Sequence, residues 1–281
     1  MYPRRKIMVE YVAIMLTSLF IFVSCEGCTG KPPVTRPARP LNISIYLDMS
    51  DRLKRNITPS QKDRDLAIVS YIADYFKNQT LGPQILQSKN NIKIFFYPTP
   101  QSSEIATLAE DLSLDITKYD GRDRRIALDG MKDKFIKNLS AIYDKTIQAN
   151  KWTGCDIWDF FNNKTVDTQC IRKGSRNVII ILTDGYLYDV NHKVVNGDSL
   201  SYITPKTLEN KNSSLIVKRT GLDDLEVRML EINPYNINHR DRLESVLEEW
   251  LKGMGVKEEN ITISETDLPT NTQTVIDSFF N

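Results

Sequence analysis

Residues 178–187 read VIIILTDGYL. The first five are apolar without interruption, a pattern typical of a strand that is covered on both faces. Thr183, Asp184 and Gly185 then end the run in a polar turn. A strand of this kind predicts a central sheet with helices packed on either side of it.

Four other apolar runs of strand length occur in the chain, at 43–48, 92–97, 226–232 and 261–263. Between the runs, apolar residues recur every three to four positions, which is typical of amphipathic helices. The spacing predicts helices over 66–76, 128–142, 243–251 and 275–279, and a further short helix starting near Thr153. Strands that alternate with helices predict an α/β fold, a Rossmann-like three-layer sandwich with a mainly parallel central sheet.

Three details complete this expected organisation. Thr58 is a candidate N-cap for the first helix, with Pro59 at its first position. The stretch 98–125 exceeds ordinary loop length and holds a candidate edge strand in LSLDIT, at 112–117. The polar stretch 190–221 is also long, and long segments of this kind in compact domains often carry function. We expect it to influence specificity.

The N-terminus has the pattern of a targeting segment. A basic start, YPRRK, precedes 12 apolar residues at 12–23, which is signal-peptide length and short for a membrane span. Ser24 immediately before Cys25 resembles the lipobox of bacterial lipoproteins, which implies cleavage after residue 24 and lipidation of Cys25. Cys28 is a competing acceptor, and an uncleaved anchor helix is the alternative. Either interpretation places the domain outside the cytoplasm and at the membrane, facing the periplasm or the cell surface.

The stretch after the lipobox-like motif is a predicted spacer. Residues 29–40 contain four prolines, which exclude a helix or a central strand and favour an extended linker. The expected organisation is therefore a signal peptide at 1–24, the lipidated cysteine and linker at 25–40, and one domain at 41–281.

Composition excludes some functions. The formal net charge is +1, and no basic stripe interleaved with aromatic residues is present, so nucleic acid is not an expected partner. Outside the N-terminal segment the only cysteines are Cys155 and Cys170. An extracytoplasmic location permits a disulfide between them, with two buried thiols as the alternative. His192 and His239 are too few for a histidine-based metal site.

Polar side chains follow two of the predicted strands. IYLDMSDRL, at 45–53, ends its strand in Asp48 and Ser50, and the strand at 178–183 is followed by Asp184. Thr153 begins the predicted helix that leads into this second strand. Ligands of open parallel sheets bind outside the carboxyl ends of the strands. Carboxylate and hydroxyl oxygens there suit a hard cation such as Mg²⁺.

The segments YLDMSDR, WTGCDIWDFF and VIIILTDGYL, in this order, resemble the von Willebrand factor A domain family. The metal-ion-dependent adhesion site of that family uses D-x-S-x-S after the first strand, a threonine that opens a helix, and an aspartate in a T-D-G-like turn. The resemblance implies Mg²⁺ or Mn²⁺ bound by Asp48, Ser50, Thr153 and Asp184. It also implies that an acidic group of a protein or other ligand completes the coordination, without catalysis.

Arg52 departs from the family pattern, because it stands where the second serine of D-x-S-x-S is expected. A guanidinium is a permanent donor and cannot ligate a cation. It could swing away and leave a weakened site, replace the ion by bridging Asp48 and Asp184, or point outward and clamp an acidic ligand. Asp51 and Tyr186 are further candidates for ligand contact. The alternatives are structural. The four candidate ligands could serve only as turn or cap residues, Asp51 could be solvated or paired with an arginine, and Tyr186 could pack in the core.

Three functions follow from these alternatives. The first is a membrane-anchored binding module that recognises a protein or acidic ligand. The second is a metal-dependent phosphoester hydrolase that uses Asp48 and Asp184, with Arg52 stabilising charge. The third is a metal-free scaffold of the same fold. We favour a binding module, because the sequence shows neither a catalytic motif nor a phosphate-cradling glycine loop.

Overall fold

The computed structural model describes residues 39–97, 102–162, 165–187, 219–235 and 237–280. The predicted signal peptide, Cys25, Cys28 and most of the linker lie outside these residues, as does nearly all of the stretch 190–221. Within the described residues, no helix combines the length and the apolar character needed to cross a bilayer.

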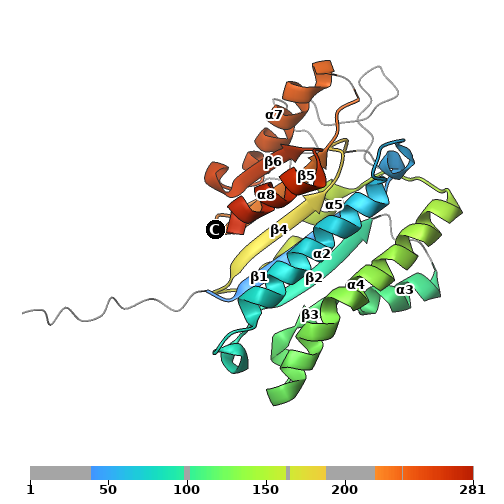
Figure 1. Cartoon of the computed structure of the whole chain (residues 1–281). Coiled ribbons are helices and arrows are strands. Elements are labelled where there is room, and N and C mark those ends of the chain that lie inside the picture. Colours follow the sequence, from blue (N-terminus) through green and yellow to red (C-terminus); the bar gives the residue numbers. More distant parts are fainter. Residues whose placement is uncertain (1–38, 98–101, 163–164, 188–218, 236, 281) are drawn as a thin grey trace, which may run out of the picture. The chain divides into compact units, whose positions relative to one another are not determined.

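The centre of the domain is a six-stranded sheet with the order β3-β2-β1-β4-β5-β6 (Figure 1). All neighbouring strands run parallel except β2 and β3, which pair antiparallel. The strands span Leu41–Asp48 (β1), Asn91–Tyr97 (β2), Ser113–Asp115 (β3), Arg176–Leu182 (β4), Leu225–Ile232 (β5) and Ile261–Glu265 (β6). The five predicted strands and the predicted edge strand are confirmed.

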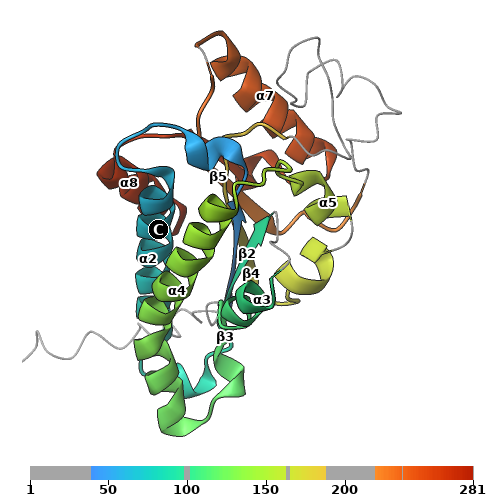
Figure 2. The same ribbon diagram turned by 90° about the vertical axis from the view of Figure 1, so that its right-hand side faces the viewer.

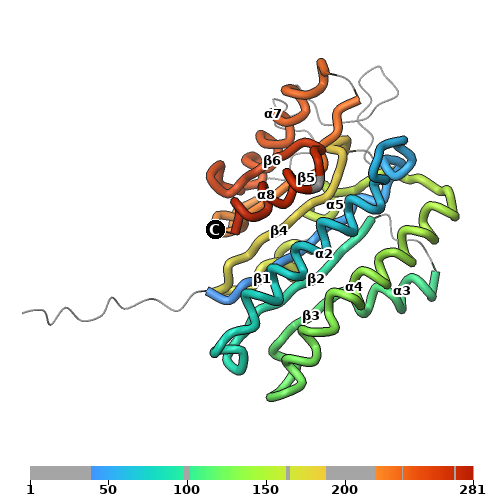
Figure 3. Tube along the Cα trace, in the orientation of Figure 1, coloured from blue at the N-terminus to red at the C-terminus, as the bar shows by residue number. Residues whose placement is uncertain are grey.

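The register of the sheet brings the ends of β1, β4 and β5 to one edge. Leu47 pairs with Leu182 of β4, and Leu182 pairs with Leu230 of β5. Asp48, Asp184 and Glu231 therefore all lie at the carboxyl edge of the sheet. Traced as a tube, the chain runs from β1 to β2 and β3, then returns to the other side of β1 as β4 (Figure 3). This reversal of strand order is the topological switch point at which α/β sheets bind ligands.

Helices cover both faces of the sheet (Figure 2). One face carries α2, α4 and α8, whose buried residues share a core with alternate residues of β1 and β4. The other face carries α5 and α7, around the core that includes Phe161 and Trp250. The helices span Gln61–Thr80 (α2), Ser103–Glu110 (α3), Gly121–Ala149 (α4), Ile157–Asn162 (α5), Ile237–Gly253 (α7) and Pro269–Phe280 (α8), with short turns at Asp51–Lys54 (η1), Ile85–Gln87 (η2), Ile116–Lys118 (η3), Val166–Cys170 (η4) and Glu258–Asn260 (η5).

The burial of β4 explains the sequence from which the fold was inferred. Val178, Ile180 and Leu182 point into the core under α2 and α4, while Ile179 and Ile181 point into the core under α5 and α7. All five side chains are inaccessible to solvent. From Val178 onwards both faces of β4 are covered by apolar cores, so the next hydrophilic side chains after Asn177 are Thr183 and Asp184 at the site.

Some local predictions are wrong in detail. Ser60, not Thr58, caps α2, since its hydroxyl accepts the backbone N–H of Asp63. The short helix begins at Ile157 rather than near Thr153, because the Asp156 carboxylate accepts the N–H of Asp159 and so satisfies the first turn.

The expected long loop at 98–125 contains α3 and the start of α4, neither of which the sequence patterns indicated there. Of the two alternatives for Cys155 and Cys170, the structure shows the second: both cysteines are buried free thiols in the core beneath α5 and α7.

Candidate functional site

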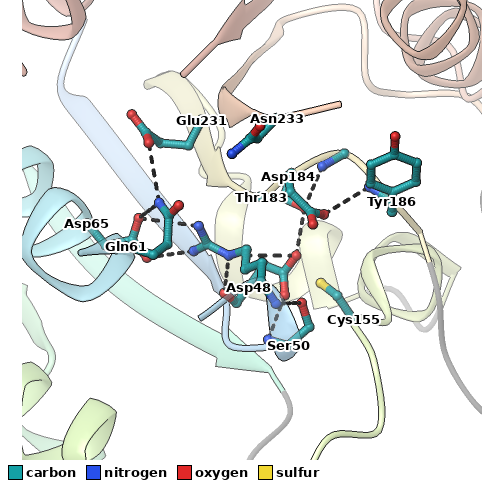
Figure 4. Close-up of polar contacts among 12 residues, drawn as sticks. Asp48, Ser50, Gln61, Asp65, Cys155, Thr183, Asp184, Tyr186, Glu231 and Asn233 are labelled. Carbon is teal, nitrogen blue, oxygen red and sulfur yellow. Dashed lines mark hydrogen bonds and ion pairs between the residues drawn. The ribbon is translucent and has the colours of Figure 1, made fainter. Parts of the chain in front are cut away.

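Asp48 is the centre of a buried polar cluster at the switch point (Figure 4). Its Oδ1 accepts the backbone N–H of Ser50 at 2.8 Å, and its Oδ2 accepts the hydroxyl of Thr183 at 2.7 Å. Thr183 in turn accepts the N–H of Gly185 at 3.2 Å. The end of β1 is thus joined to the turn that follows β4, and Asp48 is fully shielded from solvent.

Arg52 lies inside this cluster, not at its surface. Its guanidinium is paired with Asp65 of α2, with Nη2 at 2.6 Å from Oδ2, and its Nε donates to the backbone carbonyl of Asp48 at 2.5 Å. The residue is only 1% exposed. Tyr143 of α4 and Gln61 also donate to the Asp65 carboxylate, at 2.6 and 3.0 Å. Burial opposes a charged guanidinium, but Asp65 and then Asp48 raise the pKa of Arg52 above its usual value.

This position decides between the alternatives for Arg52. The hypothesis that Arg52 points outward and binds an acidic ligand is wrong, because its guanidinium is buried and paired with Asp65. The hypothesis that Arg52 bridges Asp48 and Asp184 is also wrong, because the carboxylate paired with its guanidinium is that of Asp65. The guanidinium does carry a positive charge next to the first aspartate of the motif, with Nε 3.9 Å from Asp48 Oδ2. Arg52 thus fastens β1 to α2 and α4.

The cation at Asp184 is Arg55, which the sequence patterns did not single out. Arg55 Nη2 is 2.9 Å from Asp184 Oδ2, and Nη1 donates to the backbone carbonyl of Asn233 after β5. The Arg55 guanidinium also lies over the ring of Tyr235, 4.0 Å from its centroid. Its side chain is 15% exposed, in contrast to Arg52, and its Nε is buried without a hydrogen-bond partner.

The environment of Asp184 disfavours its charged form. Burial, followed by repulsion from Asp48, raises the pKa of Asp184 from 3.8 to about 7, although Arg55 and the N–H of Tyr186 act in the opposite direction. The same two causes act on Cys155, whose sulfur points towards Asp48 in Figure 4. Burial and then Asp48 raise the pKa of its thiol well above 9.0. A thiol in this environment is protonated and unreactive.

The rim of the site is formed by the loop between β5 and α7. Tyr186 accepts the backbone N–H of Tyr235 through its phenol oxygen, and the same oxygen is 2.9 Å from His239 Nδ1. Tyr186 is 7% exposed, so it holds this loop in place and is not an open contact surface. Tyr235, at 49% exposure, is the aromatic residue that faces solvent.

The remaining predicted site residues occupy different positions. Ser50 caps η1, with its hydroxyl 3.5 Å from the Arg52 backbone nitrogen, and is buried. Asp51 and Thr153 are exposed, and neither side chain hydrogen-bonds to the described residues around Asp48. The hydroxyl beside Asp48 comes from Thr183 instead. Asp48, Ser50 and Asp184 are thus buried at the same edge of the sheet, whereas Thr153 is exposed and is not hydrogen-bonded to them.

The polar cluster continues towards β6. Gln61 donates to both Asp65 and Glu231, at 3.0 and 3.3 Å. Arg64 pairs with Glu231 through Nε at 2.7 Å and Nη2 at 3.1 Å, and also donates to the carbonyl of Asp267. Glu231 has a positive φ of 68° at an irregularity in the pairing of β5 with β6. Buried charges in this region are thus paired and hydrogen-bonded, which is the condition for burying them.

The residues present do not fit a divalent cation in the arrangement that they adopt. Of the four predicted ligands, Thr153 is exposed and not hydrogen-bonded to the others, and both oxygens of Asp48 and of Asp184 already accept hydrogen bonds. Two guanidinium groups lie beside these carboxylates, where a cation would be repelled. Across the described segments, no three His, Cys, Asp or Glu side chains are grouped as a metal site.

Comparisons with known proteins find likeness in structure only. No protein-family model matches the chain, and no curated protein matches it significantly. The fold is similar to that of BatB from Bacteroides thetaiotaomicron, with 14% identity, a TM-score of 0.43, and coverage of 85% of this chain and 96% of that one. It is also similar to an aerotolerance-related membrane protein from Bacteroides fragilis, with 14% identity, a TM-score of 0.41, and coverage of 85% and 97%.

A third similar structure is proximal thread matrix protein 1 from the mussel byssus, with a zinc-occupied adhesion-site motif. The identity is 7%, the TM-score 0.42, and the coverage 85% of this chain and 47% of that one. These values assign no function to this chain. The sheet order, the single antiparallel edge strand and the helices on both faces define this chain as a von Willebrand factor A-like α/β sandwich.

Proposed function

We propose that the chain is a lipid-anchored binding module of the bacterial envelope, which recognises an acidic group of a protein partner without a metal ion. The observation that supports this proposal is the pair formed by Arg55 and Asp184 at 2.9 Å. It puts a guanidinium at the switch point, where the metal-dependent members of the fold would hold an ion. Of the two guanidinium groups beside Asp48 and Asp184, that of Arg55 is the one that reaches the surface.

An acidic ligand meets opposing charges at this site. The carboxylates of Asp48 and Asp184 repel it, whereas the guanidinium of Arg55 attracts it. Because the pKa of Asp184 is raised to about 7, protonation of this residue near neutral pH removes one repelling charge. Protonation also releases Arg55 from its ion pair. We therefore expect acidic groups to bind more tightly below pH 7 than above it, with uptake of a proton.

Metal independence is tested by calorimetry and thermal unfolding of the purified chain with Mg²⁺ and Mn²⁺. We expect no response from the natural protein. The variant Arg55→Ser removes the ion pair at Asp184, leaves Arg52 with Asp65, and should gain a metal response. Saturable metal binding by the natural protein would overturn the proposal. Metal-dependent turnover of a generic phosphoester, lost in Asp48→Ala, would favour the hydrolase instead.

Recognition of an acidic group is tested with a matched pair of immobilised peptides, acetyl-Gly-Asp-Gly-amide and acetyl-Gly-Asn-Gly-amide. The aspartyl peptide should retain the protein at pH 6 and lose it at pH 8, and Arg55→Met should abolish retention. Lys54→Met, which removes an exposed charge from the same turn, is the control. Equal retention by both peptides contradicts a role for the carboxylate.

Membrane attachment is proposed from the sequence, because Cys25 lies outside the described residues. Lipidation places the domain at an envelope surface, with the proline-rich stretch as its spacer. Cys25→Ser should release the protein from the membrane fraction and stop incorporation of labelled fatty acid. Continued labelling of Cys25→Ser, lost only when Cys28→Ser is added, would identify Cys28 as the acceptor.

A further inference from the structure

The turns at the amino edge of the sheet, opposite the cluster around Asp48, are tied together around Asn90. The chain enters β1 at Leu41, whose backbone N–H donates to the side-chain oxygen of Asn90 at 2.8 Å. The carbonyl of Asn90 accepts the N–H of Ile116 at 3.2 Å, and its amide donates to Thr80 at the end of α2. The point at which the chain enters β1 is therefore fixed beside the turns η2 and η3.

Arg124 joins these turns to the start of α4. Its Nε donates to the carbonyl of Tyr119 at 2.7 Å, and its Nη1 donates to the carbonyls of Ile85 and Ser88 at 2.8 and 3.1 Å. We refer to residues 85–89 and 116–126 as the amino corner. In Figure 2 the turn after α2 and the start of α4 lie at the lower end of the domain, and η1, in blue, lies at the opposite end.

Three large apolar side chains are exposed at the amino corner. Leu86 is 63% exposed, Ile126 is 57% exposed and Tyr119 is 37% exposed. Tyr119 and Ile126 also line a cavity of about 420 Å³ beside β3 and α4. Exposed apolar side chains that gather in one place mark a surface that contacts a protein or a membrane.

Positive charge surrounds these apolar side chains. Five exposed cations lie along the edge from the start of β1 to the loop before β4, and none forms an ion pair with a described residue: Arg39, Lys89, Lys118, Arg122 and Lys173. Two exposed carboxylates, Asp120 and Asp123, stand among them at the start of α4. In the other half of this edge, before β5 and β6, the exposed charges are mainly carboxylates: Asp223, Asp224, Glu258 and Glu259, with Lys257.

The length of chain before Leu41 indicates what covers the amino corner. Sixteen residues separate Leu41 from Cys25, which carries the lipid anchor in the function proposed above, and the present inference rests on that attachment. At about 3.1 Å per residue, even a fully extended linker spans only about 50 Å. Such a tether gives the domain a high effective concentration at the bilayer, so contacts that are weak individually determine its orientation. The edge at which the tether ends is the edge that reaches the lipid headgroups first.

We propose that the amino corner is a membrane-docking surface, which lies on the anionic headgroups of the bilayer that holds the lipid anchor. Leu86, Tyr119 and Ile126 enter the headgroup region, and the lysines and arginines around them pair with lipid phosphates. The acidic half of the edge is repelled from the same surface, so the domain takes one tilt. Arg55 and Asp184, at the carboxyl edge, then face away from the membrane and towards a protein partner.

The test uses the full lipidated chain in vesicles that contain spin-labelled lipids, with a fluorescent dye on one introduced cysteine. Leu86→Cys places the dye in the amino corner, and Leu268→Cys, at 64% exposure after β6, is the matched control at the carboxyl edge. Both variants carry Cys28→Ser, and the remaining core thiols are buried. In mixed vesicles of phosphatidylcholine and phosphatidylglycerol, the spin labels should quench the dye at position 86 and leave the dye at position 268 unquenched.

Charge variants separate docking from attachment. Lys118→Gln with Arg122→Gln, added to Leu86→Cys, should lower the ratio of docked to undocked domain about tenfold or more, because each cation at an anionic surface contributes a factor of about five. Both side chains are exposed and unpaired among the described residues, so the variant should fold normally. Lys137→Gln with Lys151→Gln removes two exposed charges outside the amino corner and should leave the quenching unchanged.

Flotation of the protein with the vesicles distinguishes the two ways in which the proposal can fail. A chain that does not float contradicts the lipid anchor and, with it, the docking surface. A chain that floats but shows equal quenching at the two positions retains the anchor and overturns the docking surface. Quenching that is as strong in vesicles of phosphatidylcholine alone contradicts the role of anionic headgroups. Shielding of the dye at position 86 from aqueous iodide without quenching by the lipids would assign the amino corner to a protein contact instead.

Discussion

Arg55 and Asp184 are 129 positions apart in the chain, and their side chains meet at 2.9 Å at the switch point of the sheet. Asp184 carries a raised pKa in spite of this pair, because burial and the neighbouring Asp48 outweigh the guanidinium. Arg55 should therefore be the main restraint on the pKa of Asp184. In Arg55→Met the pKa should rise further above about 7. Carbon-13 NMR of the Asp184 carboxyl group measures it, and an unchanged value would show that the pair is not formed in solution.

Removal of Asp48 should have the opposite effect. Asp48→Asn keeps an oxygen that accepts the N–H of Ser50, and its amide can donate to the Thr183 oxygen in place of the hydrogen bond that Thr183 now donates. The repulsion on Asp184 disappears, and its pKa should fall towards its usual range. The same NMR measurement applies. A variant in which the pKa of Asp184 stays near 7 would assign the rise to burial alone.

Stability should depend on pH through Asp184. Its pKa is about 7 in the folded protein and near 3.8 in the unfolded chain, so the folded state binds the proton more tightly. The stabilising effect of this proton is complete below about pH 4 and is lost as pH rises through 7. The free energy of unfolding should fall by at most about 1.4 kcal/mol per pH unit in this window. Urea denaturation from pH 4 to 8 measures the slope, which Asp184→Asn should flatten.

The buried pair of Arg52 and Asp65 should be essential for folding. Arg52→Met leaves Asp65 uncompensated at 0% exposure, which should cost about 3–5 kcal/mol of unfolding free energy. Combination with Asp65→Asn should recover part of this loss. Arg125→Met, which removes a pair with Asp129 at 73% and 51% exposure, is the control and should cost less than about 1 kcal/mol. Equal losses in Arg52→Met and the control would contradict the buried network.

The two core cysteines should react as buried thiols. Burial raises the pKa of Cys170 to about 11 and that of Cys155 well above 9.0, so neither forms a reactive thiolate near neutral pH. Iodoacetamide followed by peptide mass mapping should leave both unlabelled in the native protein. Both should be labelled in denaturant without a reducing agent. Labelling that also requires a reducing agent would reveal a disulfide.

Gly185 should be irreplaceable in the turn after β4. Its φ is +91°, and an added Cβ would lie 3.1 Å from Leu243 and 3.2 Å from Leu247, both on α7. Gly174 has a similar φ of +80° but open space around it, so Gly174→Ala reports the backbone strain alone. Gly185→Ala should lower the unfolding free energy by more than Gly174→Ala does. Equal losses of unfolding free energy in the two variants would show that α7 shifts to accommodate the added methyl group.

The fold was predictable from the sequence because its signals are local. The apolar runs of β1, β4 and β5 and the helical spacing of α2 and α7 each arise within a few residues. α3 was missed because it is eight residues long and buries only Ile105. The start of α5 was misplaced because two capping residues, Thr153 and Asp156, precede the same apolar run, and the carboxylate of Asp156 forms the cap.

The site was predictable only in part, since pairing between distant charges leaves no local pattern. Asp48, Ser50 and Asp184 follow strand ends and could be placed at one edge. The partner of Arg52 lies on α2 and that of Arg55 follows β4, so neither pair could be read from spacing. One signal was present: three basic residues, Arg52, Lys54 and Arg55, directly follow the carboxylates of the first motif. Such a sequence indicates carboxylates that are neutralised by the chain itself.

The two guanidinium groups at the end of β1 also bear on how the protein matures. A site that depends on an ion is complete only after the folded chain has met that ion, and metal supply varies with the surroundings. Arg52 and Arg55 are part of the polypeptide, so their charges arrive with folding. The domain would then be ready to bind as soon as it has folded, and chelators or metal-poor growth conditions would leave its activity unchanged.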